Sequence, residues 1–238
     1  MNQKTPQQYQ VRLADKLVFN AKFERYTFEL VEPNQLKFSA GQYVSFAVSD
    51  QGHRRSWSIC SSPEIEHSFE ILIDPTPMGM GTQFLQNLKL GDEAQMMAPM
   101  GQLMIDENGV EQALVFVATG AGIAPFRSMI LDLLQVKKDT RPMILHWGLR
   151  HEEELIWQDE FQELTENFPN FQFHPVISQA TQEWSLCRGR VTDCLSVHQL
   201  LANAGYYLCG SEQMVQDVTS LLNSKSISPE RIHREKFY

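Results

Sequence analysis

A glycine-rich segment follows the most apolar run of the chain and is the strongest chemical signal in the sequence. It reads Thr119-Gly120-Ala121-Gly122-Ile123-Ala124-Pro125, and the apolar run before it, residues 113–118, is typical of a strand buried on both faces. Gly120 and Gly122 allow a tight turn and a close approach of a ligand, and Pro125 suits the first turn of a helix. A helix N-terminus offers free N–H groups and a positive dipole end, so the pattern predicts a pyrophosphate site. The alternative is a purely structural turn.

A second segment combines a cation, an aromatic ring and several hydroxyl groups. It reads Arg54-Arg55-Ser56-Trp57-Ser58-Ile59-Cys60-Ser61-Ser62 and follows a predicted strand over residues 41–48. In an extended chain Trp57 and Ser58 point to opposite faces. One position can therefore stack on a planar ring while another bonds to the ring edge, and Arg55 can pair with a phosphate. Taken alone, the segment also fits a polar strand with Trp57 in the core.

Two shorter motifs have the residues of ligand-binding turns. Met78-Gly79-Met80-Gly81-Thr82 precedes a short predicted helix and can form a nest of N–H groups for a phosphate; the alternative is an ordinary loop rich in proline and glycine. Leu208-Cys209-Gly210-Ser211 is a predicted strand-to-helix turn. It places Cys209 at the carboxyl edge of a strand, where open α/β sheets bind ligands, unless Cys209 is simply a buried thiol.

The elements that must position these motifs divide the chain in two. Alternating apolar residues over 41–48 and 68–74, separated by turn residues, predict an antiparallel barrel or sandwich with one short helix over 82–88. Farther along, strands and helices alternate, which predicts a parallel sheet with right-handed crossovers. The predicted strands cover 113–118, 143–147, 171–177 and 206–209, and the predicted helices cover 125–136, 153–168 and 212–222. The polar segment 106–109 predicts the boundary, giving domains 1–108 and 109–238.

Composition and charge exclude several classes of protein. The 238 residues are 42% hydrophobic and carry a net charge of −9, which is ordinary for a globular chain but unfavourable for general nucleic-acid binding. No apolar run approaches the ~18–20 residues of a membrane span, and no signal peptide is visible, so we expect a cytoplasmic protein. Residues 1–60 hold eight Lys and Arg against five Asp and Glu, an excess that suits an acidic partner.

The four cysteines match no familiar metal motif. Cys60, Cys187, Cys194 and Cys209 include no C-x-x-C pair, and Cys187 and Cys194 lack the His or second Cys pair of a zinc site. The spacing of a ferredoxin-type iron–sulfur cluster is also absent. We therefore expect no metal site. Free and mostly buried thiols are the simplest interpretation, with Cys209 as the exception for which a ligand role is predicted.

Taken in order, the four motifs resemble those of the ferredoxin–NADP reductase family, which includes oxygenase reductases and flavin reductases. The family pattern runs R-x-Y-S-x-x-S, G-x-x-S/T, G-T-G-I-A-P, C-G-x-x-x-M and a terminal aromatic residue, and the resemblance extends roughly from Val11 to Tyr238. It implies a two-domain fold, with an N-terminal flavin-binding antiparallel β-barrel and a C-terminal α/β parallel-sheet domain that binds NAD(P).

The resemblance also implies which residues contact an FAD cofactor. Arg55 and the loop of Gly79, Gly81 and Thr82 would hold the pyrophosphate. Trp57 would replace the family's tyrosine against the isoalloxazine ring, and Ser58 would bond near flavin N5. Ser61 would lie near the phosphates or the ribityl chain, and Tyr238, or alternatively Phe237, would cover the other face of the flavin.

For the nicotinamide nucleotide, the resemblance implies that Gly120, Gly122 and Pro125, with Thr119, carry the pyrophosphate. Cys209, followed by Gly210, would lie beside the nicotinamide ring. Among all these positions, Ser58, Cys209 and Tyr238 are the expected catalytic residues.

The sequence departs from the family pattern at three places. Trp57 keeps the stacking surface of the tyrosine but has no hydroxyl. Plant-type enzymes have Glu two residues before the terminal Tyr, where this chain has Lys236, with Glu235 one residue earlier, so a proton relay through that Glu is in doubt. The family's Ser-Arg pair is Ser178-Gln179 here.

The loss of that arginine leaves the choice between NADPH and NADH open. Arg150 and Arg190 are both candidates to bind a 2′-phosphate, but Arg150 can also pair with the Glu153 or Glu154 side chain on the following helix.

The expected activity is that of an FAD-dependent NAD(P)H oxidoreductase, an enzyme that transfers hydride between nicotinamide and flavin. Since the chain has no cluster motif of its own, a separate ferredoxin, flavodoxin or oxygenase component would accept single electrons. Two alternatives remain at this stage: a flavin reductase that uses free flavin as a substrate, and a non-catalytic module that senses flavin or nucleotide.

Overall fold

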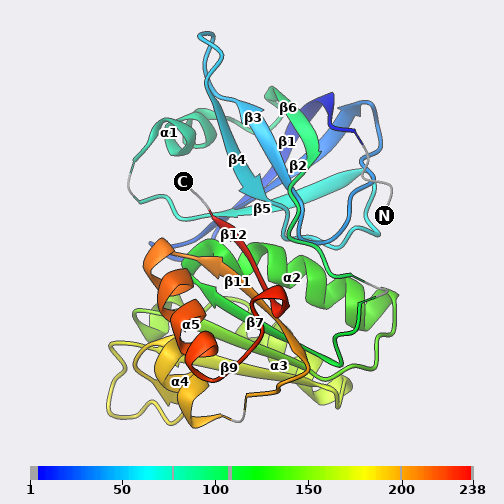
Figure 1. Cartoon of the computed structure of the whole chain (residues 1–238). Coiled ribbons are helices and arrows are strands. Elements are labelled where there is room, and N and C mark those ends of the chain that lie inside the picture. Colours follow the sequence, from blue (N-terminus) through cyan, green and yellow to red (C-terminus); the bar gives the residue numbers. More distant parts are fainter. Residues whose placement is uncertain (1–4, 77, 107–108, 199, 237–238) are drawn as a thin grey trace. The chain divides into compact units, whose positions relative to one another are not determined.

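The computed structural model describes residues 5–76, 78–106, 109–198 and 200–236, which form two compact units (Figure 1). The first unit comprises Met1–Ile105 and Ala124–Lys137, and the second comprises Asp106–Ile123 and Lys138–Tyr238. The chain thus leaves the first unit, returns to it for one helical segment, and completes the second unit afterwards. The predicted boundary between residues 108 and 109 remains a prediction.

The first unit contains a six-stranded antiparallel sheet and a short helix, as the sequence predicted. Its elements are β1 (Gln7–Val18), β2 (Glu24–Glu32), β3 (Tyr43–Ala47), β4 (Arg54–Ser58), β5 (Ser68–Ile73), α1 (Met80–Asn87) and β6 (Glu93–Met100). The strand order is β4-β3-β6-β1-β2-β5. A bridge between Ile59 and Ile71 connects the two outermost strands, so the sheet closes into the expected barrel and its edges are paired.

Alternation of side chains along the strands builds the barrel core. In β1, Tyr9, Val11 and Leu13 are buried while the residues between them are exposed, as expected when successive side chains point to opposite faces. Inside the barrel, the ring of Phe28 lies 4.9 Å from that of Phe46 between centroids. The resulting interior is apolar and rigid, which suits a support for a precisely placed surface group.

A long helical segment, α2 (Ile123–Leu131), continues into a π-helical turn over Asp132–Val136. Most of this segment belongs to the first unit, where it holds the chain that follows β4. The Arg127 guanidinium donates to the Cys60 carbonyl at 2.8 Å and to the Glu70 carboxylate at 3.1 Å. The Ser128 hydroxyl donates to the Ser61 carbonyl at 2.7 Å. These bonds fix the backbone of the predicted flavin motif.

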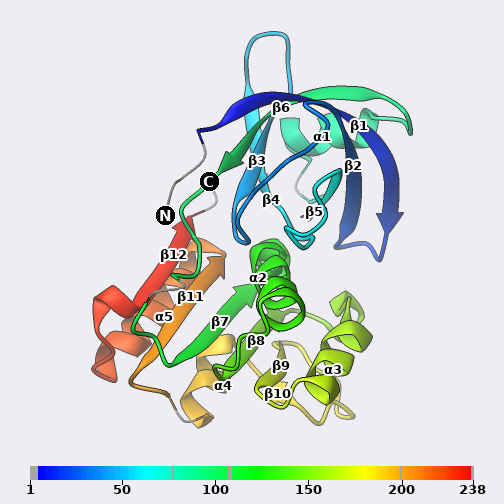
Figure 2. The same ribbon diagram turned by 90° about the vertical axis from the view of Figure 1, so that its right-hand side faces the viewer.

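The second unit contains a six-stranded parallel sheet in the order β10-β9-β8-β7-β11-β12. Its strands are β7 (Ala113–Thr119), β8 (Met143–Leu149), β9 (Phe171–Ile177), β10 (Cys187–Arg188), β11 (Ala204–Gly210) and β12 (Ile232–Lys236). Its helices are α3 (Gln158–Asn167), α4 (Val191–Val197) and α5 (Glu212–Ser224). Helices α4 and α5 pack on one face, whereas α3 contacts β9 from the other through Phe161 and Phe173, whose ring centroids are 4.9 Å apart (Figure 2).

The order of these strands creates a switch point in the sheet. From β7 the chain adds β8, β9 and β10 on one side, and then crosses to place β11 and β12 on the other side. In open α/β sheets, ligands bind outside the carboxyl ends of the strands at the position where the order reverses. Here that position is the pair of carboxyl ends of β7 and β11, which carry two of the predicted motifs.

Two details of the second unit differ from, or add to, the sequence prediction. The predicted helix over 153–168 is wrong in its first part: a 3-10 turn covers Glu152–Glu154, and α3 begins only after Trp157, which has a left-handed φ of 56°. At the start of the sheet, the buried Glu111 carboxylate accepts from Tyr207 at 2.7 Å and contacts the His233 ring at 2.6 Å. Within the described part of the chain, every helix is too short or too polar to traverse a bilayer.

Candidate cofactor sites

Strand β4 presents the predicted flavin platform at the surface of the barrel. Trp57 is half-buried and packs edge-on against Phe46 in the core, with ring centroids 5.7 Å apart. The hydroxyl oxygen of the neighbouring Ser58 is buried and has no hydrogen-bond partner, which among the described residues holds for only three side-chain atoms. An unpaired buried hydroxyl costs about 1–3 kcal/mol. Ser58 therefore has the property expected of a group that bonds to a ligand.

The first turn of α1 lies directly against this platform. A Cβ atom added at Gly81 would come within 2.9 Å of the Arg55 side chain and within 2.9 Å of the Trp57 ring. Only glycine fits there, so the motif residue allows the helix backbone to approach the aromatic ring. Gly79 is the N-cap, and no side chain caps the helix N-terminus. The structure thus brings Arg55, Trp57 and Gly81 together beside a helix N-terminus, where Thr82 occupies the first turn and can contribute an N–H group to a phosphate.

Ser61 is held more tightly than the sequence suggested. Its hydroxyl oxygen accepts from the Glu70 backbone N–H at 3.1 Å, and its carbonyl accepts from Ser128. The side chain is buried. The hydroxyl proton remains able to donate, so the predicted contact with the phosphates or the ribityl chain stays a prediction with one geometric restriction, namely that Ser61 acts as a donor.

In the second unit, the ends of β7 and β11 fit together with no space for side chains. A Cβ atom at Gly122 would lie 2.3 Å from the Cys209 carbonyl oxygen, and one at Gly210 would lie 2.2 Å from the Thr119 hydroxyl. That hydroxyl also accepts from the Ser211 backbone N–H at 3.1 Å. The structure therefore brings Thr119, Gly122, Cys209 and Gly210 together at the switch point of the sheet.

Gly120 forms the part of this turn that remains open. It adopts a left-handed φ of 54°, and nothing lies within 4 Å of the position that a Cβ atom would occupy. Its carbonyl accepts from the Trp147 ring N–H at 3.0 Å, which fixes the turn. The residues 120–122 form a 3-10 turn that leads directly into α2, with Pro125 in its first turn. This is the local geometry of a pyrophosphate site at a helix N-terminus.

Cys209 is completely buried and lies in register with Glu235 on β12. Burial raises the pKa of the Cys209 thiol well above its usual value, and the nearby Glu235 carboxylate acts in the same direction. Burial also raises the pKa of Glu235 to about 7, and its Oε2 atom is buried without a partner. The thiol is thus a neutral, compact group at neutral pH, and Glu235 is a carboxyl that can carry a proton there.

The importance of Glu235 was obscured in the sequence because position counting from the terminal Tyr pointed to Lys236. The strand register, rather than the distance from the chain end, places Glu235 opposite Cys209. The acidic residue in an apolar strand is the signal that could have identified it. Tyr238 and Phe237, predicted to cover the flavin, lie outside the described residues.

The two candidate arginines for a 2′-phosphate have different surroundings. Arg150 is exposed directly after β8, and its guanidinium lies 3.3 Å from the Gln179 amide oxygen in the orientation that satisfies that amide. The Glu154 carboxylate accepts from the Arg150 backbone N–H at 2.9 Å. Arg190 is exposed at the N-cap of α4 and lies 3.6 Å from Asp217. The guanidinium of Arg150 is the one placed at a strand end next to the missing Ser-Arg pair.

Comparison with known families assigns both parts of the chain. Residues 10–105 match the family described as oxidoreductase FAD-binding domain, and residues 116–220 match the family described as oxidoreductase NAD-binding domain. The first covers the barrel strands, and the second covers the glycine-rich turn, the parallel sheet to β11, and most of α5. The predicted fold class, an antiparallel flavin-binding barrel and a parallel α/β nucleotide-binding domain, is confirmed.

Similar curated proteins are reductase components of oxygenase systems. The chain is 31% identical over 205 residues to the anthranilate 1,2-dioxygenase electron transfer component of Acinetobacter baylyi, covering 85% of this chain and 59% of that protein. It is 32% identical over 208 residues to the phenol 2-monooxygenase reductase component of a Pseudomonas species, covering 85% of this chain and 58% of that protein. The chain thus spans about three fifths of the length of these relatives.

Solved structures show the same fold over nearly the whole chain. The Amycolatopsis cytochrome P450 reductase GcoB superposes with a TM-score of 0.87 and 26% identity, covering 98% of this chain and 70% of that chain. A ferredoxin NADP⁺ reductase from Neisseria gonorrhoeae with bound FAD and NADP superposes with a TM-score of 0.81 and 22% identity, covering 98% and 99% of the two chains.

Proposed function

We propose the function of this chain from one premise: it belongs to the ferredoxin–NADP reductase-like family of reductases, in which an FAD-binding domain precedes an NAD-binding domain. The proposed activity is the oxidation of NADH or NADPH and the delivery of electrons to a separate protein. The domain boundary at residues 108 and 109 is retained as part of this proposal.

The described residues fit an FAD cofactor. When bound, FAD accepts a hydride from the nicotinamide and releases the two electrons one at a time. Trp57 supplies a flat apolar surface for a ring system, and Arg55 supplies a positive charge beside the uncapped N-terminus of α1. Gly79, Gly81 and Thr82 contribute backbone N–H groups at that end. Tyr238 is assigned to the opposite flavin face from the family resemblance alone.

The observation that carries the proposal is the buried hydroxyl of Ser58. It has no partner within the described structure, it follows the aromatic platform directly in sequence, and a buried polar group without a partner destabilises a fold. A ligand that supplies the missing hydrogen bond explains why this position is polar. We assign Ser58 to donate to the cofactor ring near its reactive nitrogen.

On the nicotinamide side, the work of the protein is positioning. Thr119, Gly120, Gly122 and Pro125 present a tight turn and helix N-terminus to the pyrophosphate, and Cys209 with Gly210 forms the adjacent wall. Because the Cys209 thiol is neutral, it contributes shape and not charge beside a ring whose charge changes during the reaction. Such alignment of two reacting rings, with little acid–base chemistry, is how a protein assists cofactor-borne chemistry.

For the electron acceptor, we propose a ferredoxin, a flavodoxin or an oxygenase component. The names of the relatives, an electron transfer component of a dioxygenase and a reductase component of a monooxygenase, support this class of partner. The excess of Lys and Arg within residues 1–60 supports an acidic surface on the partner.

The test is anaerobic stopped-flow mixing of the purified, FAD-loaded chain with NADH and with NADPH. We expect rapid bleaching of the flavin absorption with at least one nucleotide. A chain that retains FAD but is bleached by neither nucleotide would refute the proposed activity. Loss of flavin during gel filtration, together with fast turnover of added free flavin, would instead identify a reductase that treats flavin as a diffusing substrate.

The role of Ser58 is tested with a matched pair of variants on β4. Ser58→Ala should slow flavin reduction by at least about tenfold, since it removes a hydrogen-bond donor aimed at the reacting ring. Ser56→Ala, on the same strand and exposed, should leave the rate within about twofold. Arg150→Ala and Arg190→Ala identify the residue that binds a 2′-phosphate, because only the correct one lowers the preference for NADPH over NADH.

A further inference from the structure

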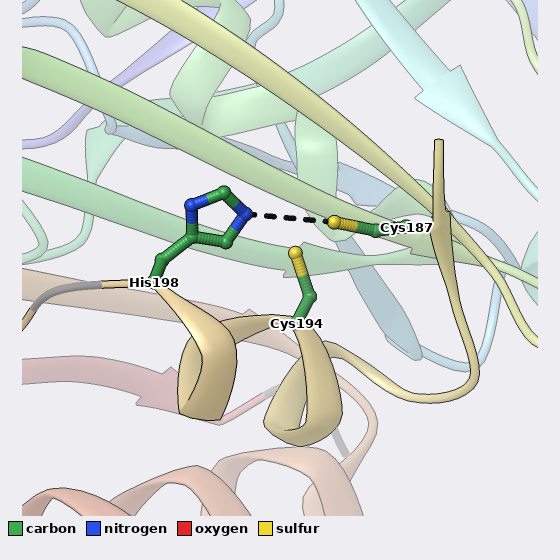
Figure 3. A group of neighbouring side chains, drawn as sticks. All are labelled: Cys187, Cys194 and His198. Atoms are coloured by element: carbon green, nitrogen blue, oxygen red, sulfur yellow. Dashed lines mark hydrogen bonds between the residues drawn. The ribbon is translucent and has the colours of Figure 1, made fainter. Parts of the chain in front are cut away.

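Two thiols and three imidazole rings converge on the face of the parallel sheet that α4 covers. Cys187 is on β10, Cys194 is within α4, and His198 caps the C-terminus of α4. One potential ligand atom from each of these three residues lies within 4.8 Å of the other two. Figure 3 shows the two side chains of α4 pointing toward Cys187, whose Sγ is 3.6 Å from His198 Nε2.

The expectation that Cys187 and Cys194 lack a histidine partner is therefore wrong. Cys194 and His198 are four residues apart and share one face of a helical turn. Pairing between β8 and β9 places His146 directly opposite His174. These distant segments meet only through the sheet and its covering helix, so local sequence spacing could not reveal the cluster.

The two strand histidines complete the set of donor atoms. His146 Nδ1 lies 3.3 Å from Cys194 Sγ. The His174 ring lies 4.3 Å from that of His198 and 5.0 Å from that of His146, measured between centroids. Burial is the main cause that lowers the pKa of His146 to about 3 and that of His174 to about 4. Both rings are thus neutral at pH 7 and keep a nitrogen lone pair.

The separations agree with tetrahedral coordination of zinc. Zn–S bonds of about 2.3 Å and Zn–N bonds of about 2.0–2.1 Å put tetrahedral ligand atoms roughly 3.4–3.8 Å apart. The S–N separations of 3.6 Å and 3.3 Å lie near this range. Closing the widest separation allowed within the trio, 4.8 Å, requires a side-chain movement of about 1 Å.

We propose that Cys187, Cys194 and His198 bind one Zn²⁺ ion, with His146 as the fourth ligand. Two thiolates and two imidazoles are a common donor set for structural zinc, and thiolate ligands favour zinc over magnesium or calcium. His174 stacks on two of the ligand rings and orients them.

The proposed zinc ion would fasten a functional segment to the sheet. Cys187 and Cys194 lie on either side of Arg188, Gly189 and Arg190, the connection from β10 to α4. Binding both cysteines closes this connection into a short loop. The exposed Arg190, a candidate for nucleotide selectivity, would then project from a fixed backbone.

The direct test is the zinc content and affinity of the full, FAD-loaded chain. The protein is stripped with a chelator under reducing conditions, titrated with ZnCl₂ against a chromophoric competitor, and analysed for metal after gel filtration. We expect one zinc per chain. Cys194→Ser should weaken zinc binding by at least about 100-fold, since even changes outside the ligand set cost 10–100-fold.

Matched variants separate the site from general thiol or imidazole binding. Cys60→Ser and His53→Gln, both in the first unit, should retain one zinc with unchanged affinity. Cys187→His replaces one ligand by another and should also retain one zinc, which guards against a variant that loses metal by misfolding. Amide hydrogen exchange of residues 187–198 should slow when zinc is added to the parent chain.

Three results would overturn the proposal. The first is a reduced parent chain that binds no zinc at micromolar concentration. The second is an equal zinc content in the parent and Cys194→Ser proteins. The third is isolation of the chain with a Cys187–Cys194 disulfide and no capacity for zinc after reduction.

Discussion

Replacing Glu235 by Gln should change how the stability of the second unit depends on pH. Glu235 lies in register with the fully buried Cys209. Burial raises its pKa from 4.5 to about 7, and its Oε2 atom has no hydrogen-bond partner. Gln has nearly the same shape but cannot ionise, so the variant removes the titration while preserving the packing.

The sign follows from proton binding. Between pH 4.5 and about 7 the folded chain binds a proton at Glu235 that the unfolded chain has released. The stabilisation from this proton is complete below pH 4.5 and is lost as the pH rises through 7. At about 1.4 kcal/mol for each tenfold change in proton affinity, the upper limit is about 3 kcal/mol. Because the residue retains partial contact with solvent, we expect about 2 kcal/mol between pH 5 and 8.

The assay is amide hydrogen exchange of peptides that cover β11 and β12, which reports the opening of this unit without requiring the whole chain to unfold in one step. Opening of the parent protein should become easier from pH 5 to 8, after correction for the intrinsic exchange rate, whereas Glu235→Gln should show no such trend. Glu230→Gln, an exposed neighbour, should behave like the parent. Parallel profiles for the parent and Glu235→Gln proteins would refute the claim that this carboxyl is protonated at neutral pH.

Three further predictions concern the elements around the sites. Gly81→Ala should weaken FAD binding by about tenfold or more, measured by flavin fluorescence, because its Cβ would press on Trp57; Gly79→Ala, which points into open space, should leave the backbone near the ring unchanged and serves as its control. Arg127→Ala should destabilise the first unit by about 2–3 kcal/mol in urea titrations, through the loss of two hydrogen bonds to the chain after β4. Glu111→Gln should reduce the loss of stability in acid: burial opposes its charge, but two hydrogen bonds outweigh that effect and lower its pKa, so the native contribution is present above pH 4.5 and lost as the pH falls. A variant with the parent's acid sensitivity would contradict this assignment.

Sequence patterns identified the strands because burial on one or two faces leaves a period that a single chain displays. The run over 113–118 became β7, and the alternating run over 68–74 became β5. The predicted helix over 153–168 was less accurate because its first residues are held by a turn. Trp157 takes a left-handed conformation between the 3-10 turn and α3, and nothing in the local sequence, such as Gly or Pro, indicates that break.

The sites show the same division between local and distant information. The turn around Gly120 could be predicted since the strand, glycines and helix are consecutive. The position of Glu235 required the register of β12 on β11, and the contact of Cys187 with His198 required the packing of α4 on the sheet. Residue spacing specifies a ligand set only when all ligands lie on one or two neighbouring elements, and these do not.

Buried polar atoms without partners connect the fold to the proposed activity. Among the described residues these are Arg25 Nε, Ser58 Oγ and Glu235 Oε2. Arg25 has ion pairs through its other nitrogens, so its orphan atom costs little beyond the charge already paired. Ser58 and Glu235 have no such compensation, and each lies beside a residue predicted to contact a cofactor. Since a folded chain tolerates few such atoms, and each costs about 1–3 kcal/mol, their location indicates that binding competence was kept at the expense of stability. It follows that FAD should raise the stability of the first unit by more than the same FAD concentration raises that of the Ser58→Ala protein.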